Sequence, residues 1–278
     1  MGFRLANIDN RAALLDDTSF YDVFAISDGQ LGPDPMTAIT DVPALHALAQ
    51  DLDRNEPTGA LADRVLGPPV SRPRNSFGIG LNYRSHAAEA EMEVPEVPLV
   101  FTKFPSCIVG PMAEVELRCE TADYEAELVV VIGRSGRNID SASAWDHVAG
   151  VMAGQDISDR ALQFAAKPPH FDLGKSRDTF GPTGPCLVST DLLDDRDDIH
   201  ITCDVNGDRR QDDSTANLIF NVPELIAYIS TIMTLAPGDI IFTGTPEGVG
   251  ATQSNFLKPG DIVTTTISGV GTLTNRCR

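Results

Sequence analysis

The sequence has few positively charged residues and no long hydrophobic run. Lysine and arginine number 21 against 40 aspartate and glutamate residues, a formal net charge of −19. Such a polyanion repels phosphate backbones and anionic membrane surfaces, and no basic cluster in the sequence could act as a local patch. The longest strictly apolar run, Leu128 to Ile132, is far shorter than the ~20 residues that a membrane-spanning helix needs. We therefore expect neither a nucleic-acid nor a membrane partner.

The cysteine pattern argues against a disulfide framework and a structural zinc site. The five cysteines are an odd number, and no two of them form a Cys-x-x-Cys pair. The first residues also lack the apolar segment that is typical of a secretory signal. We therefore expect reduced thiols in a cytoplasmic protein.

Several widespread catalytic motifs are missing as well. The sequence contains no GxxxxGK[ST], no GxSxG and no HExxH, so a P-loop, a hydrolase elbow and a zinc peptidase are unsupported. Gly78 and Gly80 are similar to the start of a dinucleotide fingerprint, but Tyr83 stands where the third glycine is needed.

A segment rich in proline and glycine, residues 66–76, divides the chain. Because proline can continue neither a helix nor a central strand, we place a domain boundary near residue 72. This predicts a small N-terminal α/β domain, residues 1–72, and a larger domain, residues 73–278. A chain of 278 residues can bury a substantial core without disulfide or zinc support.

Most of the larger domain has the pattern of short strands, with many β-branched residues between turn residues. The predicted strands are 4–8, 20–26, 97–104, 124–133, 186–190, 199–207, 239–244 and 261–269. Apolar residues at helical spacing predict helices over 42–52, 141–152 and 222–234. The expected fold class is α+β and predominantly β, a sandwich or roll with mixed connections.

Two carboxylates alternate along one of these predicted strands. Glu125 and Glu127 are spaced i, i+2, which places both side chains on one face, and the apolar run that follows is typical of a strand buried on both faces. Adjacent buried carboxylates repel each other, so they protonate or need a cation such as Mg²⁺, Mn²⁺ or Ca²⁺. The alternative is a solvent-facing sheet edge, where such a pair costs little.

Three further features could carry chemistry or could be purely structural. His86 and Glu89 are spaced i, i+3 on a predicted helical face, where the carboxylate would make the imidazole a better base; the alternative is a surface ion pair. Asp156 follows an apolar segment and by itself is typical of a helix N-cap. The glycine- and threonine-rich loop 243–250 could hold an anion with its N–H groups and the Thr245 hydroxyl, or could form a tight turn.

Taken together and in order, eight motifs resemble the fumarylacetoacetate hydrolase family. They are GIGLNYRSHAAE, VFTKFPSCIVGP, DYEAELVVVIG, GQDISDRALQ, GKSRDTFGPTGP, VNGDRRQDDST, FTGTPEGVG and FLKPGDIV, and they span nearly all of residues 76–270. The sequence is most similar to the short, bacterial-type branch. The resemblance implies a mixed β-sandwich roll with a smaller N-terminal domain, and a homodimer.

The resemblance also implies roles for individual residues. Glu125, Glu127 and Asp156 match the ligands of a divalent cation, Mg²⁺ or Mn²⁺, and His86 with Glu89 matches the acid–base pair. Lys175 matches a lysine that polarises the substrate. Positions near the substrate are matched by Arg84, Lys103, Gln163 and Thr245. Two motifs depart from the family pattern, because Gln155 replaces the common asparagine before Asp156, and Ser158-Asp159-Arg160 replaces Ser-Ala-Arg.

The implied activity is metal-dependent hydrolysis of the C–C bond of a 2,4-dioxo acid, an acylpyruvate, to pyruvate and a carboxylic acid. Several basic residues matched to the site suggest a dianionic, fumarylpyruvate-like substrate. The alternative on the same site is an oxaloacetate decarboxylase or a 2-hydroxyhepta-2,4-diene-1,7-dioate isomerase or hydratase. A silent family member or a calcium-binding structural module would need none of His86, Glu89 and Lys175, so we expect an enzyme.

Overall fold

The computed structural model describes residues 2–62 and 64–278. Its strands are β1 (Arg4–Ile8), β2 (Arg11–Leu15), β3 (Ser19–Asp22), β4 (Gly59–Ala60), β5 (Leu66–Gly67), β6 (Ser76–Gly80), β7 (Leu99–Thr102), β8 (Ile108–Val109), β9 (Ala122–Asp123), β10 (Ala126–Ile132), β11 (Val148–Gln155), β12 (Ser158–Asp159), β13 (Gly181–Val188), β14 (His200–Val205), β15 (Asp208–Ser214), β16 (Ile240–Phe242), β17 (Ile262–Ile267) and β18 (Gly271–Arg276). Its α-helices are α1 (Val23–Ile26), α2 (Pro35–Ala38), α3 (Val42–Gln50), α4 (Arg84–Glu89), α5 (Arg160–Gln163), α6 (Phe171–Gly174), α7 (Val222–Ile232) and α8 (Gly250–Gln253). Short 3₁₀ helices are η1 (Leu52–Arg54), η2 (Pro105–Cys107), η3 (Ser141–His147), η4 (Thr190–Leu192) and η5 (Thr215–Asn217).

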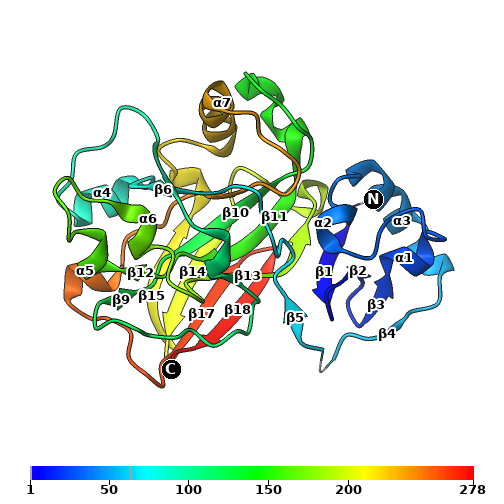
Figure 1. Ribbon diagram of the computed structural model, residues 1–278, viewed down its shortest axis with the longest axis horizontal. Helices are drawn as coiled ribbons and strands as arrows, with labels where there is room; N and C mark the ends of the chain where they lie inside the picture. Colours follow the sequence, from blue (N-terminus) through cyan, green and yellow to red (C-terminus); the bar gives the residue numbers. More distant parts are fainter. Residues whose placement is uncertain (1, 63) are drawn as a thin grey trace.

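A long mixed sheet runs through the whole molecule (Figure 1). Its strands follow the order β4-β3-β2-β1-β13-β11-β10-β16-β6-β7, with β5 beside β1 and β8 beside β13. A second sheet, in the order β15-β14-β17-β18, packs against β10, β11 and β13 of the first. The predicted mixed, mostly-sheet sandwich roll is confirmed.

The core lies between the two sheets and is centred on β10. Every residue of β10 is buried, as the apolar run Leu128–Ile132 predicts for a strand covered on both faces. The helix predicted over 222–234 is found as α7, which starts with a capping box between Asn221 and Glu224 and packs against η3.

The N-terminal segment is joined to the rest of the fold through β1. Backbone pairing of Arg4 with Val188 and of Leu5 with Leu187 attaches β1 to β13, so that the strands shown in blue in Figure 1 extend the central sheet. The domain boundary near residue 72 stays a prediction. The strand predicted over 20–26 is only half correct, because the carboxylate of Asp22 accepts the N–H of Ala25 and starts α1.

The prediction of a helix over 141–152 is wrong. Only residues 141–147 are helical, as η3, and the chain then continues as β11, which lies between β10 and β13 in the centre of the sheet. Gly150 lies so close to the neighbouring strand that a Cβ atom there would be 2.3 Å from the carbonyl oxygen of Val188. Strand pairing at both edges therefore overrides the helical spacing of the apolar residues.

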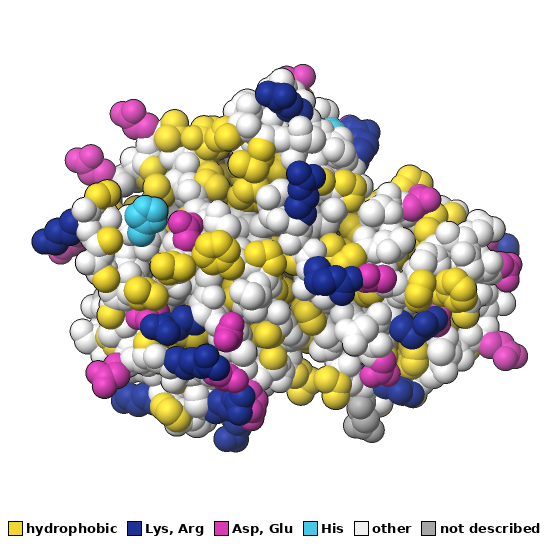
Figure 2. All heavy atoms as spheres, viewed as in Figure 1, with side chains coloured by type: hydrophobic (Ala, Val, Ile, Leu, Met, Phe, Trp, Pro, Cys, Tyr) yellow, Lys and Arg dark blue, Asp and Glu magenta, His cyan; other side chains and the backbone are white. Residues whose placement is uncertain are grey.

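The surface carries acidic and basic side chains side by side. On the face in Figure 2, lysine and arginine side chains stand next to acidic ones, and apolar side chains gather across the upper part of the molecule. Examples of such pairs are Arg118 with Glu116 and Arg209 with Asp204. None of the helices in the described residues has the length and apolar character needed to cross a bilayer.

Candidate metal and catalytic site

Three carboxylates meet where β10 begins and β11 ends. Glu125 directly precedes β10, Glu127 lies within it, and Asp156 follows β11. The antiparallel pairing of the strands sets Glu127 opposite Gly154, and the N–H of Asp156 donates to the carbonyl of Glu125 at 2.9 Å. One oxygen of each carboxylate lies within 4.8 Å of the others, and all three side chains are buried.

This burial decides between the two interpretations of each acid. Glu125 is 5% exposed and Glu127 1%, so the pair does not lie on a solvent-facing edge. Asp156 is 0% exposed and caps no helix; the N-cap of the next helix, α5, is Asp159. The structure therefore brings together all three acids of the predicted ligand set.

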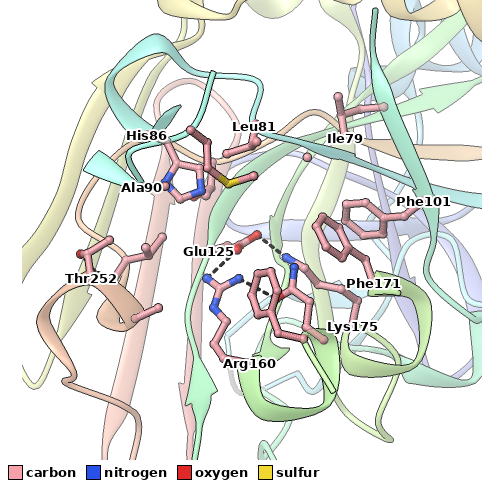
Figure 3. Close-up of a pocket in the computed structure, with 17 residues that line it drawn as sticks. Ile79, Leu81, His86, Ala90, Phe101, Glu125, Arg160, Phe171, Lys175 and Thr252 are labelled. Atoms are coloured by element: carbon pink, nitrogen blue, oxygen red, sulfur yellow. Dashed lines mark hydrogen bonds and ion pairs between the residues drawn. The ribbon is translucent and has the colours of Figure 1, made fainter. Parts of the chain in front are cut away.

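Three cations surround the acids. The ammonium of Lys175 lies 2.6 Å from Glu125 Oε2 and 3.0 Å from Asp156 Oδ2. The ammonium of Lys103 lies 2.6 Å from Asp156 Oδ1. Arg160 Nη2 lies 2.7 Å from Glu125 Oε1, as one of the dashed contacts in Figure 3 shows.

These cations are divided unequally among the acids. Burial alone would raise the pKa of Glu125, but Lys175 and Arg160 outweigh burial and hold the pKa at about 2. Burial, Asp156 and Glu125 together raise the pKa of Glu127 well above its ordinary value. Glu127 therefore favours its protonated form unless a further positive charge lies beside it.

A divalent cation fits this donor set. Buried carboxylate oxygens are the hard ligands that Mg²⁺ and Mn²⁺ prefer. Among the described residues, Asp156 Oδ2 finds no hydrogen bond of good geometry, although it is buried and Lys175 is near. Glu127 Oε2 accepts the N–H of Gly244 at 2.7 Å; Gly244 has φ 101°, a backbone conformation that favours glycine.

The predicted acid–base pair faces the same place. Asn82 donates hydrogen bonds to the carbonyls of Phe220 and Thr243, which anchors the start of α4 beside the loop after β16. On α4, His86 Nδ1 lies 3.7 Å from Glu89 Oε2, which is too far for a hydrogen bond. The spacing i, i+3 therefore places the two side chains together as expected.

Glu89 is held in turn by the loop that follows Thr245. Its carboxylate accepts the N–H of Gly248 at 3.0 Å and the hydroxyl of Thr252 at 2.7 Å. Burial alone would raise the pKa of Glu89, but the contacts with His86, Thr252 and Gly248 lower it overall. Glu89 is therefore a carboxylate that can orient the imidazole of His86.

A cavity of about 110 Å³ is lined by His86 of the acid–base pair and by Glu125 of the three acids. In Figure 3, His86 and Thr252 lie on one side of Glu125, while Phe101 and Phe171 lie on the other. Most of the lining is apolar, and its polar side chains are those of His86, Glu125, Arg160, Gln163, Lys175, Thr245 and Thr252.

The four residues predicted near the substrate divide into two groups. Gln163 and Thr245 line the cavity, where Gln163 accepts a hydrogen bond from Arg160 and the hydroxyl of Thr245 donates to the carbonyl of Ala126. Lys103 and Arg84 differ from the expectation, since neither lines this cavity.

The reasons for these two differences are opposite. The Lys103 ammonium is fully buried behind Asp156 and also donates to the carbonyls of Lys175 and Phe180, so all three of its hydrogens have acceptors. Arg84 is exposed at the first position of α4, and the spacing i, i+2 from His86 puts the two side chains on different faces of the helix.

The two departures from the family motif have structural partners. Gln155 accepts the N–H of Glu125 at 3.0 Å and donates to the hydroxyl of Thr265 at 2.8 Å, which ties the acid-bearing strand to β17 in the second sheet. The carboxylate of Asp159 accepts hydrogen bonds from Arg177 at 2.8 Å and from the N–H of Leu162 at 3.2 Å. Asp159 therefore joins α5 to the segment that follows Lys175.

We expect Asp159→Ala to lower the free energy of unfolding by about 1–3 kcal/mol, because it removes the cap of α5 and the partner of Arg177. Burial alone would raise the pKa of Asp159, but the N–H of Leu162 and Arg177 lower it overall. A lowered pKa stabilises the fold above the ordinary carboxyl pKa and stops doing so as the pH falls through the folded value. Urea unfolding at several pH values should show that the loss of unfolding free energy in Asp159→Ala becomes smaller at acidic pH.

The exposed Asp178→Asn is the matched control for this experiment, since Asp178 lies on the same segment but is 61% exposed. Asp178→Asn should lower the free energy of unfolding by less than about 0.5 kcal/mol at every pH. An equal pH dependence in the two variants would contradict the assignment of Asp159.

Sequence reasoning missed two residues that complete the site. Arg160 links Glu125 to Asp123, whose carboxylate lies 2.8 Å from the guanidinium and accepts the N–H of Gly250 at 2.7 Å. The signal for Asp123 was present, because it continues the alternation of Glu125 and Glu127 on the same strand face. Arg160 stands in the motif Ser158-Asp159-Arg160, but no local spacing pairs it with Asp123 and Glu125, which are more than 30 residues earlier in the sequence.

Comparison with known families decides what this arrangement belongs to. Residues 75–278 match the model described as the fumarylacetoacetate (FAA) hydrolase C-terminal domain. The chain belongs to the fumarylacetoacetate hydrolase family. Members of this family are enzymes, among them hydrolases, isomerases and tautomerases.

Relatives within the fumarylacetoacetate hydrolase family differ in the reactions they catalyse. The chain is 39% identical to the mitochondrial oxaloacetate tautomerase fahd2 of Xenopus laevis, over 84% of this chain and 74% of the relative. It is 44% identical to an HpcE-type protein from Mycobacterium smegmatis, with a TM-score of 0.90 and coverage of 99% of this chain and 98% of that one.

A third member of the family was solved with a metal ion. The maleylpyruvate hydrolase of Sphingobium sp. SYK-6, in complex with manganese(II) and pyruvate, is 29% identical, with a TM-score of 0.83 and coverage of 99% and 98%. The predicted family is thereby confirmed. The homodimer and the roles of single residues stay predictions.

Proposed function

We propose that this protein is a divalent-metal-dependent hydrolase of acylpyruvates, which it cleaves to pyruvate and a carboxylic acid. One observation carries the proposal: three buried acids converge, and one of them, Glu125, lines a small cavity together with His86. A cation alone would account for the acids, and a surface ion pair would account for His86 and Glu89. Their meeting at one cavity favours catalysis on a small molecule.

Glu125, Glu127 and Asp156 would hold Mg²⁺ or Mn²⁺, which when bound supplies Lewis acidity to the 2-oxo acid end of the substrate. His86, oriented by Glu89, accepts a proton from water as the water oxygen attacks the distal carbonyl carbon. The ammonium of Lys175 stabilises the oxyanion that forms there. The C–C bond then breaks, pyruvate leaves as its enolate, and the enolate carbon takes up a proton to give the methyl group.

A second candidate is keto–enol tautomerisation of oxaloacetate, favoured by the 39% identity to the Xenopus laevis tautomerase. It needs the same acids and the same proton transfer at carbon, but no attack by water. Oxaloacetate decarboxylation and the isomerisation of a dienedioate share that enolate chemistry as well.

A substrate panel separates these reactions. Metal-stripped protein is incubated with acetylpyruvate, fumarylpyruvate or oxaloacetate, with and without Mn²⁺ or Mg²⁺, while pyruvate release and the enol absorbance are followed. We expect metal-dependent pyruvate release from the acylpyruvates to exceed that from oxaloacetate. Enol conversion of oxaloacetate without cleavage of any acylpyruvate would establish the tautomerase instead. No turnover of any compound would overturn both candidates.

A further inference from the structure

A second, larger cavity shares part of its wall with the cavity at Glu125. This second cavity has a volume of about 370 Å³ and shares Met92, Phe101 and Phe171 with the first. Two of the shared residues, Phe101 and Phe171, lie on the other side of Glu125 from His86 (Figure 3). A substrate that extends past these two rings would reach the second cavity.

The walls of the second cavity are apolar. Phe101 and Phe171 pack edge to face with ring centroids 5.8 Å apart, and Phe164 packs on Phe171 in the same way at 5.9 Å. Leu99, Val100 and Pro169 complete the apolar lining. Apolar side chains of this lining remain open to solvent, with Met92 48% exposed and Leu99 40% exposed. Covering them with an apolar group would remove that surface from water.

The charges point to the same class of ligand. Among its described lining residues, the second cavity has no lysine or arginine; its charged group is Asp172, with His170 Nδ1 3.6 Å away. The arginine and lysine of the first cavity, Arg160 and Lys175, are directed at Glu125. A second carboxylate on the substrate would therefore sit near Asp172 without a cation to balance it.

We infer that the part of the substrate remote from the 2-oxo acid is an uncharged apolar acyl group, alkyl or aryl, bound against Phe101, Phe171 and Met92. The inference rests on the proposed function. It replaces the fumarylpyruvate-like preference, which was based on several basic residues expected near the substrate. Of these, Arg84 is exposed, Lys103 is buried against Asp156, and neither lines the second cavity. The supplying reaction would be one that places a 2-oxo acid unit on a hydrophobic chain or ring.

A matched pair of substrates tests the inference. Hexanoylpyruvate and adipoylpyruvate have acyl chains of equal length and differ in a terminal carboxylate, and acetylpyruvate is too short to reach the second cavity. Each buried methylene group improves binding by about fourfold at most, so kcat/KM for hexanoylpyruvate should exceed that for acetylpyruvate by roughly tenfold or more. It should exceed that for adipoylpyruvate by a larger factor. Equal or better turnover of adipoylpyruvate would overturn the inference and leave the hydrolase intact.

Two variants test the location of the subsite. Met92→Lys places a cation on the shared wall, so it should lower kcat/KM for hexanoylpyruvate relative to acetylpyruvate and raise kcat/KM for adipoylpyruvate relative to acetylpyruvate. Met112→Lys is the control, because Met112 is 68% exposed and lines neither cavity. The same shift in both variants, or none in Met92→Lys, would contradict the assignment.

A binding measurement separates failure of the subsite from failure of the proposed reaction. Calorimetry of the Mn²⁺-loaded protein with 2-oxooctanoate and with 2-oxooctanedioate compares the two chain ends without any turnover. Tighter binding of 2-oxooctanoate, by roughly tenfold, would support the apolar subsite even if no acylpyruvate were cleaved. Tighter binding of the dicarboxylate would overturn it, whatever the activity.

Discussion

The Glu127→Gln variant should bind Mn²⁺ at least about a hundredfold more weakly than the unmodified protein and should lose catalytic activity. Changes outside the ligand sphere of a metal site already cost 10–100-fold, so loss of a charged ligand should cost at least the upper end of that range. Calorimetric titration of the metal-stripped protein with Mn²⁺ measures the affinity directly. Pyruvate release from acetylpyruvate at saturating Mn²⁺ measures the activity.

The stability of the same variant distinguishes a metal ligand from a residue that merely supports the fold. Because Glu127 favours its protonated form in the absence of metal, the neutral glutamine should leave the metal-free protein as stable as before or slightly more stable. Added Mn²⁺ at a hundred times its dissociation constant should stabilise the unmodified protein by about 2.7 kcal/mol and the variant hardly at all.

Glu247→Gln provides the matched control, since Glu247 is exposed on the loop after β16 and the same charge is removed close to the site. Its Mn²⁺ affinity and activity should equal those of the unmodified protein. Strong stabilisation of Glu127→Gln by Mn²⁺ would show that Glu127 is not a ligand.

Replacing His86 with glutamine should lower kcat by roughly 10²–10⁴-fold, the usual contribution of a positioned acid or base. The affinity for Mn²⁺ should not change, because His86 pairs with Glu89 and is not one of the three acids that converge. His200→Gln is the control, since His200 is exposed on β14 and pairs with Asp212 away from the cavity. Hydrolysis that continues unchanged in His86→Gln would refute its role in activating water.

Exchange of the methyl protons of pyruvate for deuterium, followed by NMR, identifies which proton His86 moves. If the variant loses hydrolysis but keeps the exchange, His86 acts on water and another group protonates the enolate carbon. If the variant loses both hydrolysis and exchange, His86 also transfers the proton to the enolate carbon. That proton transfer is the step that hydrolysis and tautomerisation share. Glu89→Gln should give the same pattern with a smaller loss, because it orients the ring without touching the substrate.

The local parts of the site could be predicted because they depend on short-range periodicity. The spacing i, i+2 set Glu125 and Glu127 on one strand face, and the apolar run after them indicated burial. The spacing i, i+3 likewise set His86 beside Glu89 on α4. Each of these inferences needs only the geometry of a single element, and the structure agrees with each.

The cation partners could not be predicted in this way. Lys103 is basic and stands near motif residues, yet strand pairing places it behind Asp156, where its hydrogens are all used. Arg160 matches the arginine of a family motif but was given no role from the sequence, yet the fold sets it between Glu125 and Asp123. Which charge meets which acid depends on contacts between segments that are distant in the chain.

The sequence by itself determined the family, the mostly-sheet fold class and the identity of the acids that converge. Only the tertiary structure decided that residues 148–155 form a central strand, that Arg84 does not line the cavity, and that the adjoining cavity is apolar apart from His170 and Asp172. The physical reason is that periodicity records which face of an element is buried. Strand pairing across the whole sheet decides which other element packs on that buried face. It therefore also decides which charged residues come to lie there.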